Sequence, residues 1–294
     1  MEAFLGYCIT GILTGILYGL IALGFVIIYK ASGVFNFAHG QLVALGAFLF
    51  WQFIVEFGLP VTIAIPCLFF SLVIIAFLLE RAFLDRLIGQ PAFPLVMVTL
   101  AMFTILQGVI VLFWGGPALA YPQIIPLGTI NWGNIVIGEQ YIWTSLASII
   151  ILAFYFYFFE RTRMGLAMKA VSESHWLSHL IGISVRNIFV LAWIMACLVA
   201  AAGGILLGFI TGLHAGLSGI GLKAIPVVLL GGLESMHGVI VAGIIIGLIE
   251  ALVGSYLDPL VGGGLRDIVP FAIMILVLFF KPEGLFGWKR MERV

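Results

Sequence analysis

The sequence has few charged residues. Lys and Arg number 13 and Asp and Glu number 13 in 294 positions, which is 9% of the chain, whereas hydrophobic residues make up 63%. A soluble globular domain carries about 25% charged residues, so this composition excludes that class of protein. The positive and negative charges also balance, and we therefore expect no nucleic acid among the partners.

Cysteine and histidine are also scarce, and neither a disulfide framework nor a metal site is expected. The 3 cysteines, Cys8, Cys67 and Cys197, each lie within an apolar run, which is typical of small buried hydrophobic residues. His175 and His179 have the i, i+4 spacing of one helix face but lack a third ligand nearby. A solvated helix face is the favoured interpretation of this pair.

Signatures of catalysis are missing as well. The chain has no G-x-x-x-x-G-K-S/T loop for ATP phosphates, no H-E-x-x-H and no G-x-S-x-G. Ion-coupled carriers usually keep Asp, Glu or His at mid-membrane depth, and here Glu250 is the main ionisable residue inside a predicted span. We therefore expect a transport protein with no enzyme activity and no bound cofactor or metal, driven by a separate motor. A secondary carrier or passive facilitator for small solutes is the alternative.

Long apolar runs are the main feature that is present. About 20 apolar residues cross the hydrocarbon core of a bilayer as a helix. A further apolar segment, 223–232, has about half that length and contains Pro226. We predict an all-α polytopic membrane protein of one domain over residues 1–294, with eight or nine crossings depending on whether 223–232 crosses or re-enters. The predicted spans are 6–29, 41–57, 60–79, 93–114, 141–159, 188–211, 238–254 and 266–280.

The basic residues predict the orientation of these spans. Short cytoplasmic loops are enriched in Lys and Arg, and here Lys and Arg gather at 30, 81–86, 161–186 and 281–293. Segment 115–140 has no Lys or Arg, so we place this loop and the N-terminus outside.

Small residues at every fourth position predict close helix packing. One such stripe lies in the first predicted span and the other in the span 188–211. The two stripes are Gly11, Gly15 and Gly19, and Ala196, Ala200, Gly204, Gly208 and Gly212.

The segment 160–187 is the longest polar interruption in the chain. Small and apolar residues recur through it at helical spacing, which predicts an amphipathic helix parallel to the membrane on the inner side. Such a helix is either a platform for a cytoplasmic partner or a helix lying on lipid headgroups. The predicted inward positions are Ala167, Ala170, Val171, Ser174, Leu177 and Ile181, opposite Lys169, Ser172, Glu173 and Trp176.

Several polar and glycine residues are candidates for a translocation path, because two short or broken segments in corresponding places often mark one. Asn36, His39 and Gln41 either line the path or hydrogen-bond the ends of broken helices. The glycines near the second broken segment allow a break or a close backbone approach, and they are Gly231, Gly232 and Gly238. Glu250 either pairs with a cation from a neighbouring helix or binds a substrate ammonium group.

Short motifs along the whole chain resemble one family, the integral membrane permeases of branched-chain amino acid (Liv-type) ABC importers, specifically the H-type subunit. They are N-F-A-H-G at 36–40, L-G-A at 45–47, R-x-G at 163–165, L-I-G-I at 180–183, K-A at 223–224, L-G-G-L at 230–233 and K-P-E-G-L-F-G at 281–287. The chain departs from the family pattern between Val171 and Ser178.

The resemblance implies an ABC importer permease in the bacterial cytoplasmic (inner) membrane. It implies four kinds of partner: a related second permease, two cytoplasmic ATPase subunits that hold ATP and Mg, a solute-binding protein outside, and the lipid membrane itself. Transport by alternating access is then expected for branched-chain amino acids or a related small polar solute, with urea, amides and aromatic acids left open. The resemblance also makes 165–183 the coupling helix to the ATPase, with contact residues Gly165, Lys169, Glu173, Trp176 and Gly182.

Overall fold

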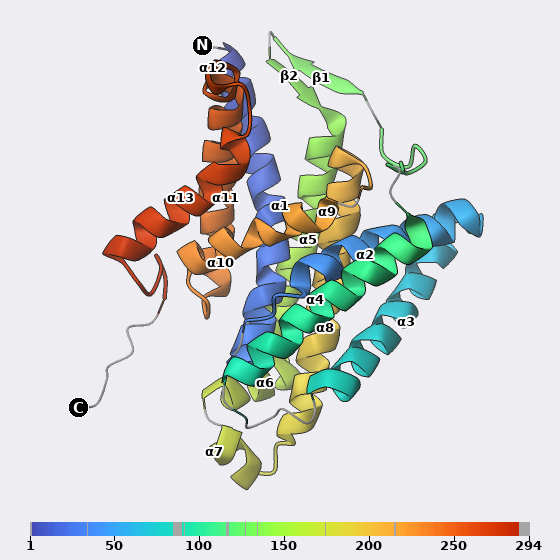
Figure 1. The fold of residues 1–294 in the computed structure, drawn as a ribbon, viewed down its shortest axis with the longest axis vertical. Coiled ribbons are helices and arrows are strands. Elements are labelled where there is room, and N and C mark those ends of the chain that lie inside the picture. Colours follow the sequence, from blue (N-terminus) through green and yellow to red (C-terminus); the bar gives the residue numbers. More distant parts are fainter. Residues whose placement is uncertain are drawn as a thin grey trace.

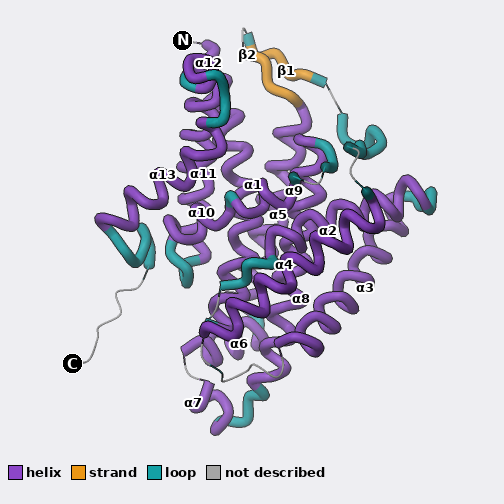
Figure 2. Tube along the Cα trace, viewed as in Figure 1, coloured by secondary structure: helices purple, strands orange, loops and turns teal. Residues whose placement is uncertain are grey.

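The computed structural model describes residues 2–33, 35–84, 90, 92–115, 118–126, 128–133, 135–173, 175–214 and 216–287. Within these ranges the chain is a bundle of helices with one small β-hairpin (Figures 1 and 2). The N-terminus and the hairpin lie at one end of the bundle, and the helices of the 160–187 segment lie at the other. Arg86, Lys289, Arg290 and Arg293, which supported the predicted orientation, lie outside the described residues.

Six helices in the described part are long and apolar enough to cross a membrane. They are α1 (Glu2–Ser32), α3 (Val61–Leu79) with its π-helical end η2 (Glu80–Leu84), α4 (Ala92–Trp114), α5 (Glu139–Arg161), α8 (Val185–Thr211) and α11 (Met236–Tyr256). Shorter helices occupy the other predicted spans, and they are α2 (His39–Trp51) with its π-helical end η1 (Gln52–Glu56), α9 (Leu217–Leu222), α10 (Ala224–Gly231) and α13 (Leu265–Phe280). The prediction of an all-helical polytopic membrane protein is confirmed, apart from the hairpin.

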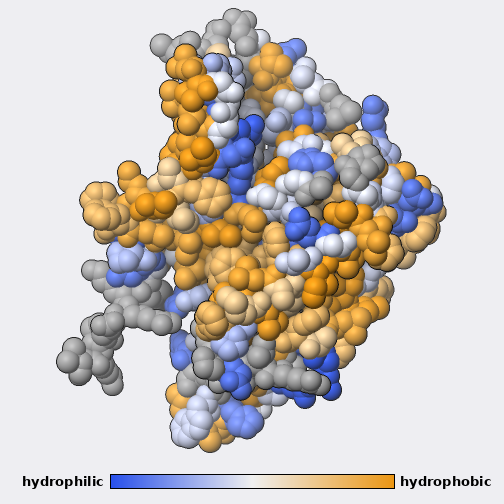
Figure 3. Space-filling model, viewed as in Figure 1, coloured by the Kyte–Doolittle hydropathy of each residue, from blue (hydrophilic) through white to orange (hydrophobic). Residues whose placement is uncertain are grey.

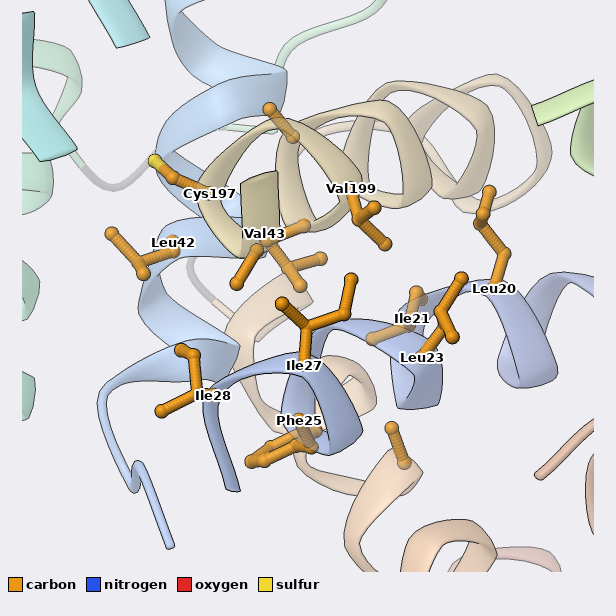
Figure 4. Close-up of a cluster of buried hydrophobic side chains, with 14 of the residues drawn as sticks. Leu20, Ile21, Leu23, Phe25, Ile27, Ile28, Leu42, Val43, Cys197 and Val199 are labelled. Atoms are coloured by element: carbon orange, nitrogen blue, oxygen red, sulfur yellow. The ribbon is translucent and has the colours of Figure 1, made fainter. Parts of the chain in front are cut away.

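Helix α1 is the centre of the bundle. It packs against α11 and α8 along its length and also contacts α5 and α10. From Leu17 to Ile28 nearly every side chain is buried, and Figure 4 shows this part of α1 meeting side chains of α2 and α8. Lipid is as apolar as these side chains, so dense packing rather than exclusion from water holds such helices together.

The glycine stripe of α1 lies directly against α11. A Cβ on Gly15 would lie 2.5 Å from the carbonyl oxygen of Gly243, and a Cβ on Gly247 would lie 2.5 Å from the Cα of Gly15. Because backbone atoms occupy both sides of this contact, neither helix has room for a side chain there. The predicted close packing at Gly11, Gly15 and Gly19 is therefore a backbone-to-backbone contact.

The short helices α9 and α10 follow one another between α8 and α11. Just after α8, Leu213 exchanges two backbone hydrogen bonds with Leu119 of the outer loop, at 2.8 and 2.9 Å. The other end of α10 leads into the turn at 232–235, where Glu234 shares a depression with Lys30 and Lys169. The segment that the sequence left open as crossing or re-entrant is thus the second of two short helices, which meet at Lys223. Whether it crosses or re-enters stays a prediction.

The loop 115–140, which is predicted to lie outside, contains regular structure that the sequence did not predict. Strands β1 (Thr129–Trp132) and β2 (Ile135–Gly138) form an antiparallel hairpin with Thr129 opposite Gly138. Side chains hold the loop and the end of α4 to α2 and η1: Tyr121 Oη donates to the Ala47 carbonyl at 2.8 Å, and Trp114 Nε1 donates to Gln52 Oε1 at 2.9 Å. Burial raises the pKa of Tyr121 well above its usual value, so its hydroxyl remains a donor.

The inner segment 160–187 forms two helices rather than the single helix predicted over 165–183. Helix α6 (Arg163–Glu173) is followed by the separate helix α7 (His175–Leu180). Val171 is fully buried as predicted, but Leu177 and Ile181 are 58% and 73% exposed. The predicted inward face is wrong beyond Glu173, because the helical phase is not continuous from α6 into α7. Ser174 lies outside the described residues.

We predict that Gly243→Ala separates α1 from α11, because the added methyl group meets backbone that cannot move aside. Overpacking of this kind costs about 1–3 kcal/mol, and the thermal unfolding midpoint of the purified protein should fall. The matched control is Gly108→Ala in α4, where no described atom lies within 4 Å of the new Cβ. Equal midpoints for the two variants would contradict the assigned contact.

Candidate functional site

The residues predicted for the translocation path fall into three separate regions. Asn36, His39 and Gln41 lie buried where α2 begins, beside α1. The three glycines form the inner turn between α10 and α11. Glu250 lies in the outer part of α11, among charged residues of other helices. The structure therefore does not bring these candidates together into one site.

The start of α2 is organised by the polar side chains at 36 and 39. Asn36 Oδ1 accepts a hydrogen bond from the Ala38 amide at 3.0 Å, and the Asn36 carbonyl accepts one from the His39 amide at 3.2 Å. His39 is fully buried, with Nε2 3.1 Å from the Ile21 carbonyl oxygen and its ring 4.2 Å from that of Phe25. These bonds support the interpretation that the polar residues satisfy a broken helix end.

Three polar atoms in this region are nevertheless buried without a hydrogen-bond partner among the described residues, and they are Asn36 Nδ2, His39 Nδ1 and Gln41 Nε2. Asn36 also lines a cavity of about 10 Å³ with Thr99 and Trp193. That volume holds about one water molecule. It is far too small for an amino acid in this conformation of the protein.

The inner turn is held by the C-terminal segment. The amides of Leu285 and Phe286 donate to the carbonyls of Leu230 and Gly231 at 2.7 and 3.3 Å. These carbonyls belong to the last turn of α10, where helix carbonyls lack partners within their own helix. The motif K-P-E-G-L-F-G therefore supplies the hydrogen bonds that close α10. The sequence indicated this motif only as a family feature and as the end of the last span.

Two open depressions lie beside this turn, on the side of the bundle where α1 ends. One, of about 180 Å³, is lined by Lys30 of α1, Lys169 of α6 and His237 of α11, among others. The second, of about 310 Å³, lies between α1, α10, α13 and the C-terminal segment. Glu234 lines both depressions.

Glu250 is the centre of a buried charge cluster. Its Oε1 lies 2.8 Å from Lys223 Nζ and 3.0 Å from Arg266 Nε, and it accepts a longer hydrogen bond of 3.3 Å from Tyr18 Oη. Lys223 Nζ also lies 2.7 Å from Asp267 Oδ1. The side chain of Glu250 is only 2% exposed, so its charge requires these partners.

The predicted pairing of Glu250 with a cation is therefore present, and two cations take part. The sequence missed which ones, because Lys223 was treated as the edge of a short apolar segment and Arg266 as the start of a span. Their signal was that Lys223 is a lone charge beside an apolar run, and that Arg266 stands with Asp267 at the start of a long one. Such charges in a membrane protein usually pair with one another.

Comparison with known proteins places the whole chain in one family. The family described as the branched-chain amino acid transport system permease component matches residues 7–278. The chain belongs to this family.

Curated relatives match over nearly their full lengths. The high-affinity branched-chain amino acid transport system permease proteins BraD of Pseudomonas aeruginosa and LivH of Escherichia coli are 26% and 28% identical, each over 99% of this chain and 98% of the relative. A probable LivH permease of Methanocaldococcus jannaschii is 26% identical over 94% of this chain and 90% of that protein.

A solved structure, PsaBC from Streptococcus pneumoniae in complex with Fab, has a TM-score of 0.50 at 13% identity, covering 94% of this chain and 92% of that one. At this identity the likeness concerns the fold alone, which is that of an ABC importer permease. The chain is accordingly the permease component of a branched-chain amino acid ABC import system. It is a multi-pass inner-membrane protein and a non-catalytic part of a multi-subunit assembly.

The predicted coupling residues of this permease differ in their surroundings. Lys169, Glu173 and Trp176 are exposed, and Trp176 is 71% exposed. Gly165 is buried, and a Cβ there would lie 2.6 Å from the Phe158 carbonyl oxygen at the end of α5. Gly182 is exposed and has a φ of +85° just after α7.

The described residues contain no group of three His, Cys, Asp or Glu side chains that could hold a metal ion. His179 is exposed, but the side chain of His175 is outside the described part, so the predicted solvated helix face formed by the two stays a prediction.

We predict that Gly284→Ala weakens the cap on α10. Gly284 has a φ of +81°, and a Cβ there would lie 2.6 Å from the Leu229 carbonyl oxygen. The matched control is Gly58→Ala, which also has a positive φ, of +62°, but has no described atom within 4 Å of the new Cβ. The left-handed conformation alone costs about 1–2 kcal/mol. The unfolding midpoint should therefore fall clearly further for Gly284→Ala, and an equal fall would refute the cap.

Proposed function

We propose that this permease translocates branched-chain amino acids by alternating access, with ATPase subunits acting on it through α6 and α7. In this proposal a related second permease completes the membrane unit, and two cytoplasmic ATPases hold ATP and Mg. A loaded solute-binding protein docks outside on the surface that includes 115–140. The chain itself contributes the helices that move. The placement of α6 carries the proposal.

Helix α6 is joined rigidly to the spanning helices. It contacts α5, α1 and α8, and its inward residues Met168 and Val171 are almost fully buried. At its start, Thr162 Oγ1 accepts from the Gly165 amide at 3.0 Å and donates to the Phe158 carbonyl at 2.7 Å. In this proposal, a displacement of α6 by the ATPase therefore moves α1, α5 and α8 together.

The face of α6 and α7 that points away from the helix bundle is suited to bind a cytoplasmic partner. It presents the exposed Lys169 and Glu173 on α6 and Trp176 on α7. An exposed tryptophan beside charged residues is a common anchor in protein interfaces. Leu177, Leu180 and Ile181 are also exposed, at 58%, 63% and 73%, and they extend this face with apolar surface.

Substrate is proposed to pass through the centre of the bundle. Asn36, His39 and Gln41 would be contacted as α1, α2 and α8 move apart, which would expose their unpartnered atoms. The glycine turn of Gly231, Gly232 and Gly238 lies beside the two inner depressions, which suit an exit on the cytoplasmic side. Glu250 lies toward the end of the bundle opposite to these two depressions. A secondary carrier or passive facilitator, the alternative from the sequence, is disfavoured by the family assignment.

We predict that Lys169→Glu combined with Trp176→Ala uncouples the transporter. The double variant removes the central charge and the exposed aromatic ring of the proposed contact while leaving the buried face of α6 intact. Assembly of the permease pair should be retained, and substrate-stimulated ATPase activity in proteoliposomes should be lost. Coupling requires two sites that bias the same pair of states.

The matched control is Glu56→Lys combined with Trp143→Ala, which changes an exposed charge and a half-exposed tryptophan near the outer end. This control should keep normal stimulation. Normal stimulated turnover in the Lys169→Glu, Trp176→Ala variant would refute α6 and α7 as the site of coupling.

A further inference from the structure

Four charged side chains, Lys223, Glu250, Arg266 and Asp267, form the cluster that we call the charge quartet. They come from three separate segments: the break between α9 and α10, the helix α11, and the first turn of α13. The quartet contains two cations and two anions. The charges of the quartet therefore balance. A ligand that binds there without adding an unbalanced buried charge must have no net charge, either as a zwitterion or as a neutral molecule.

One carboxylate oxygen of the quartet is unpartnered. The bonds from Lys223, Arg266 and Tyr18 all go to Oε1 of Glu250. Oε2 of the same side chain is buried and has no hydrogen-bond partner among the described residues. A buried oxygen of an ionised carboxylate is costly to leave unbonded, so Oε2 marks a position for a hydrogen-bond donor.

The quartet extends from this buried atom to the surface. The side chains of Glu250 and Lys223 are 2% and 10% exposed, whereas those of Arg266 and Asp267 are 55% and 74% exposed. Figure 3 shows hydrophilic atoms gathered near the start of α13, between apolar surfaces. Within the described residues the guanidinium of Arg266 pairs only through Nε, which leaves its terminal amino groups available to an anion.

We propose that the charge quartet is a binding site for the α-ammonium and α-carboxylate groups of the transported amino acid. The ammonium group binds Glu250 Oε2 and Asp267, and the carboxylate binds the guanidinium of Arg266 and the amine of Lys223. Arginine suits this role because its planar fork matches a carboxylate. The site recognises the α-ammonium and α-carboxylate groups, which all amino acids share, and makes no contact with the amino-acid side chain. This inference rests on the proposed transport function.

The chain also provides a way for the site to open. Three consecutive glycines, Gly262, Gly263 and Gly264, have φ values of +86°, +103° and +93° directly before α13. No described atom lies within 4 Å of a Cβ built on any of them. The first turn of α13 can therefore move on a segment without packed side chains. When the zwitterion replaces the direct ion pairs from α13 to Lys223 and Glu250, the first turn of α13 moves outward and stays linked to these two residues through the ligand.

Glu250→Gln tests the site with a side chain of the same shape. The permease pair with its ATPases, purified without the binding protein, is heated with and without millimolar leucine, because a ligand that binds the folded state raises the unfolding midpoint. Leucine should stabilise the parent, whereas 4-methylpentanoic acid, which lacks the amino group, and 3-methylbutylamine, which lacks the carboxylate, should not.

The Glu250→Gln variant should need at least tenfold more leucine than the parent for the same rise in the unfolding midpoint. The control Glu56→Gln, an acid-to-amide change at an exposed residue at the end of η1, should respond as the parent does.

A double variant, Lys223→Met with Glu250→Met, separates binding from folding. Replacing a buried ion pair by apolar side chains of similar size is often neutral for stability, whereas removing one partner is not. This variant should keep the unfolding midpoint of the parent without ligand and lose the response to leucine. An unchanged leucine response in either variant, or a parent that responds equally to the two half-analogues, overturns the site. The proposed function would still stand in that case, because it is tested by ATPase coupling through α6 and α7.

Discussion

The close contact between α1 and α11 is the interaction on which the rest of the arrangement depends. Gly15 and Gly243 let the two backbones meet without intervening side chains. In lipid, where apolar burial gives no net drive between helices, such dense contact is a main source of stability. It also brings Tyr18 of α1 within hydrogen-bonding distance of Glu250 on α11. The position of the charge cluster is thus a consequence of the glycine contact.

The second constraint is that polar groups inside a membrane need partners within the protein. It explains three features that look unrelated in the sequence. The C-terminal segment bonds the free carbonyls of α10, Asn36 bonds the start of α2, and the break between α9 and α10 places Lys223 beside Glu250. Each is a point where a helix is interrupted. At each interruption, a side chain or backbone group from elsewhere in the chain meets the polar groups that the break leaves exposed.

Much of the fold could be predicted because it follows from local patterns. The spans at 93–114 and 188–211 begin one and three residues after α4 and α8 do and end at the same residues, since their boundaries are marked by polar residues and aromatic ends. The inner segment was predicted less well. Its apolar spacing continues through Leu177 and Ile181, but the helix does not continue in phase, and periodicity alone cannot detect that change. The hairpin in 115–140 was missed, because its strands are only four residues long.

The sequence by itself determined the class of the protein, its family and six of its eight predicted spans, because composition, run length and motifs are properties of contiguous residues. The tertiary structure decided which distant residues meet. Glu250 lies 27 positions from Lys223 and 232 from Tyr18, and no local pattern connects them. They come together only because α1 and α11 pack through glycine and the chain between α8 and α11 is broken at Lys223. Partners for buried charges are chosen by packing, and packing is a property of the whole bundle.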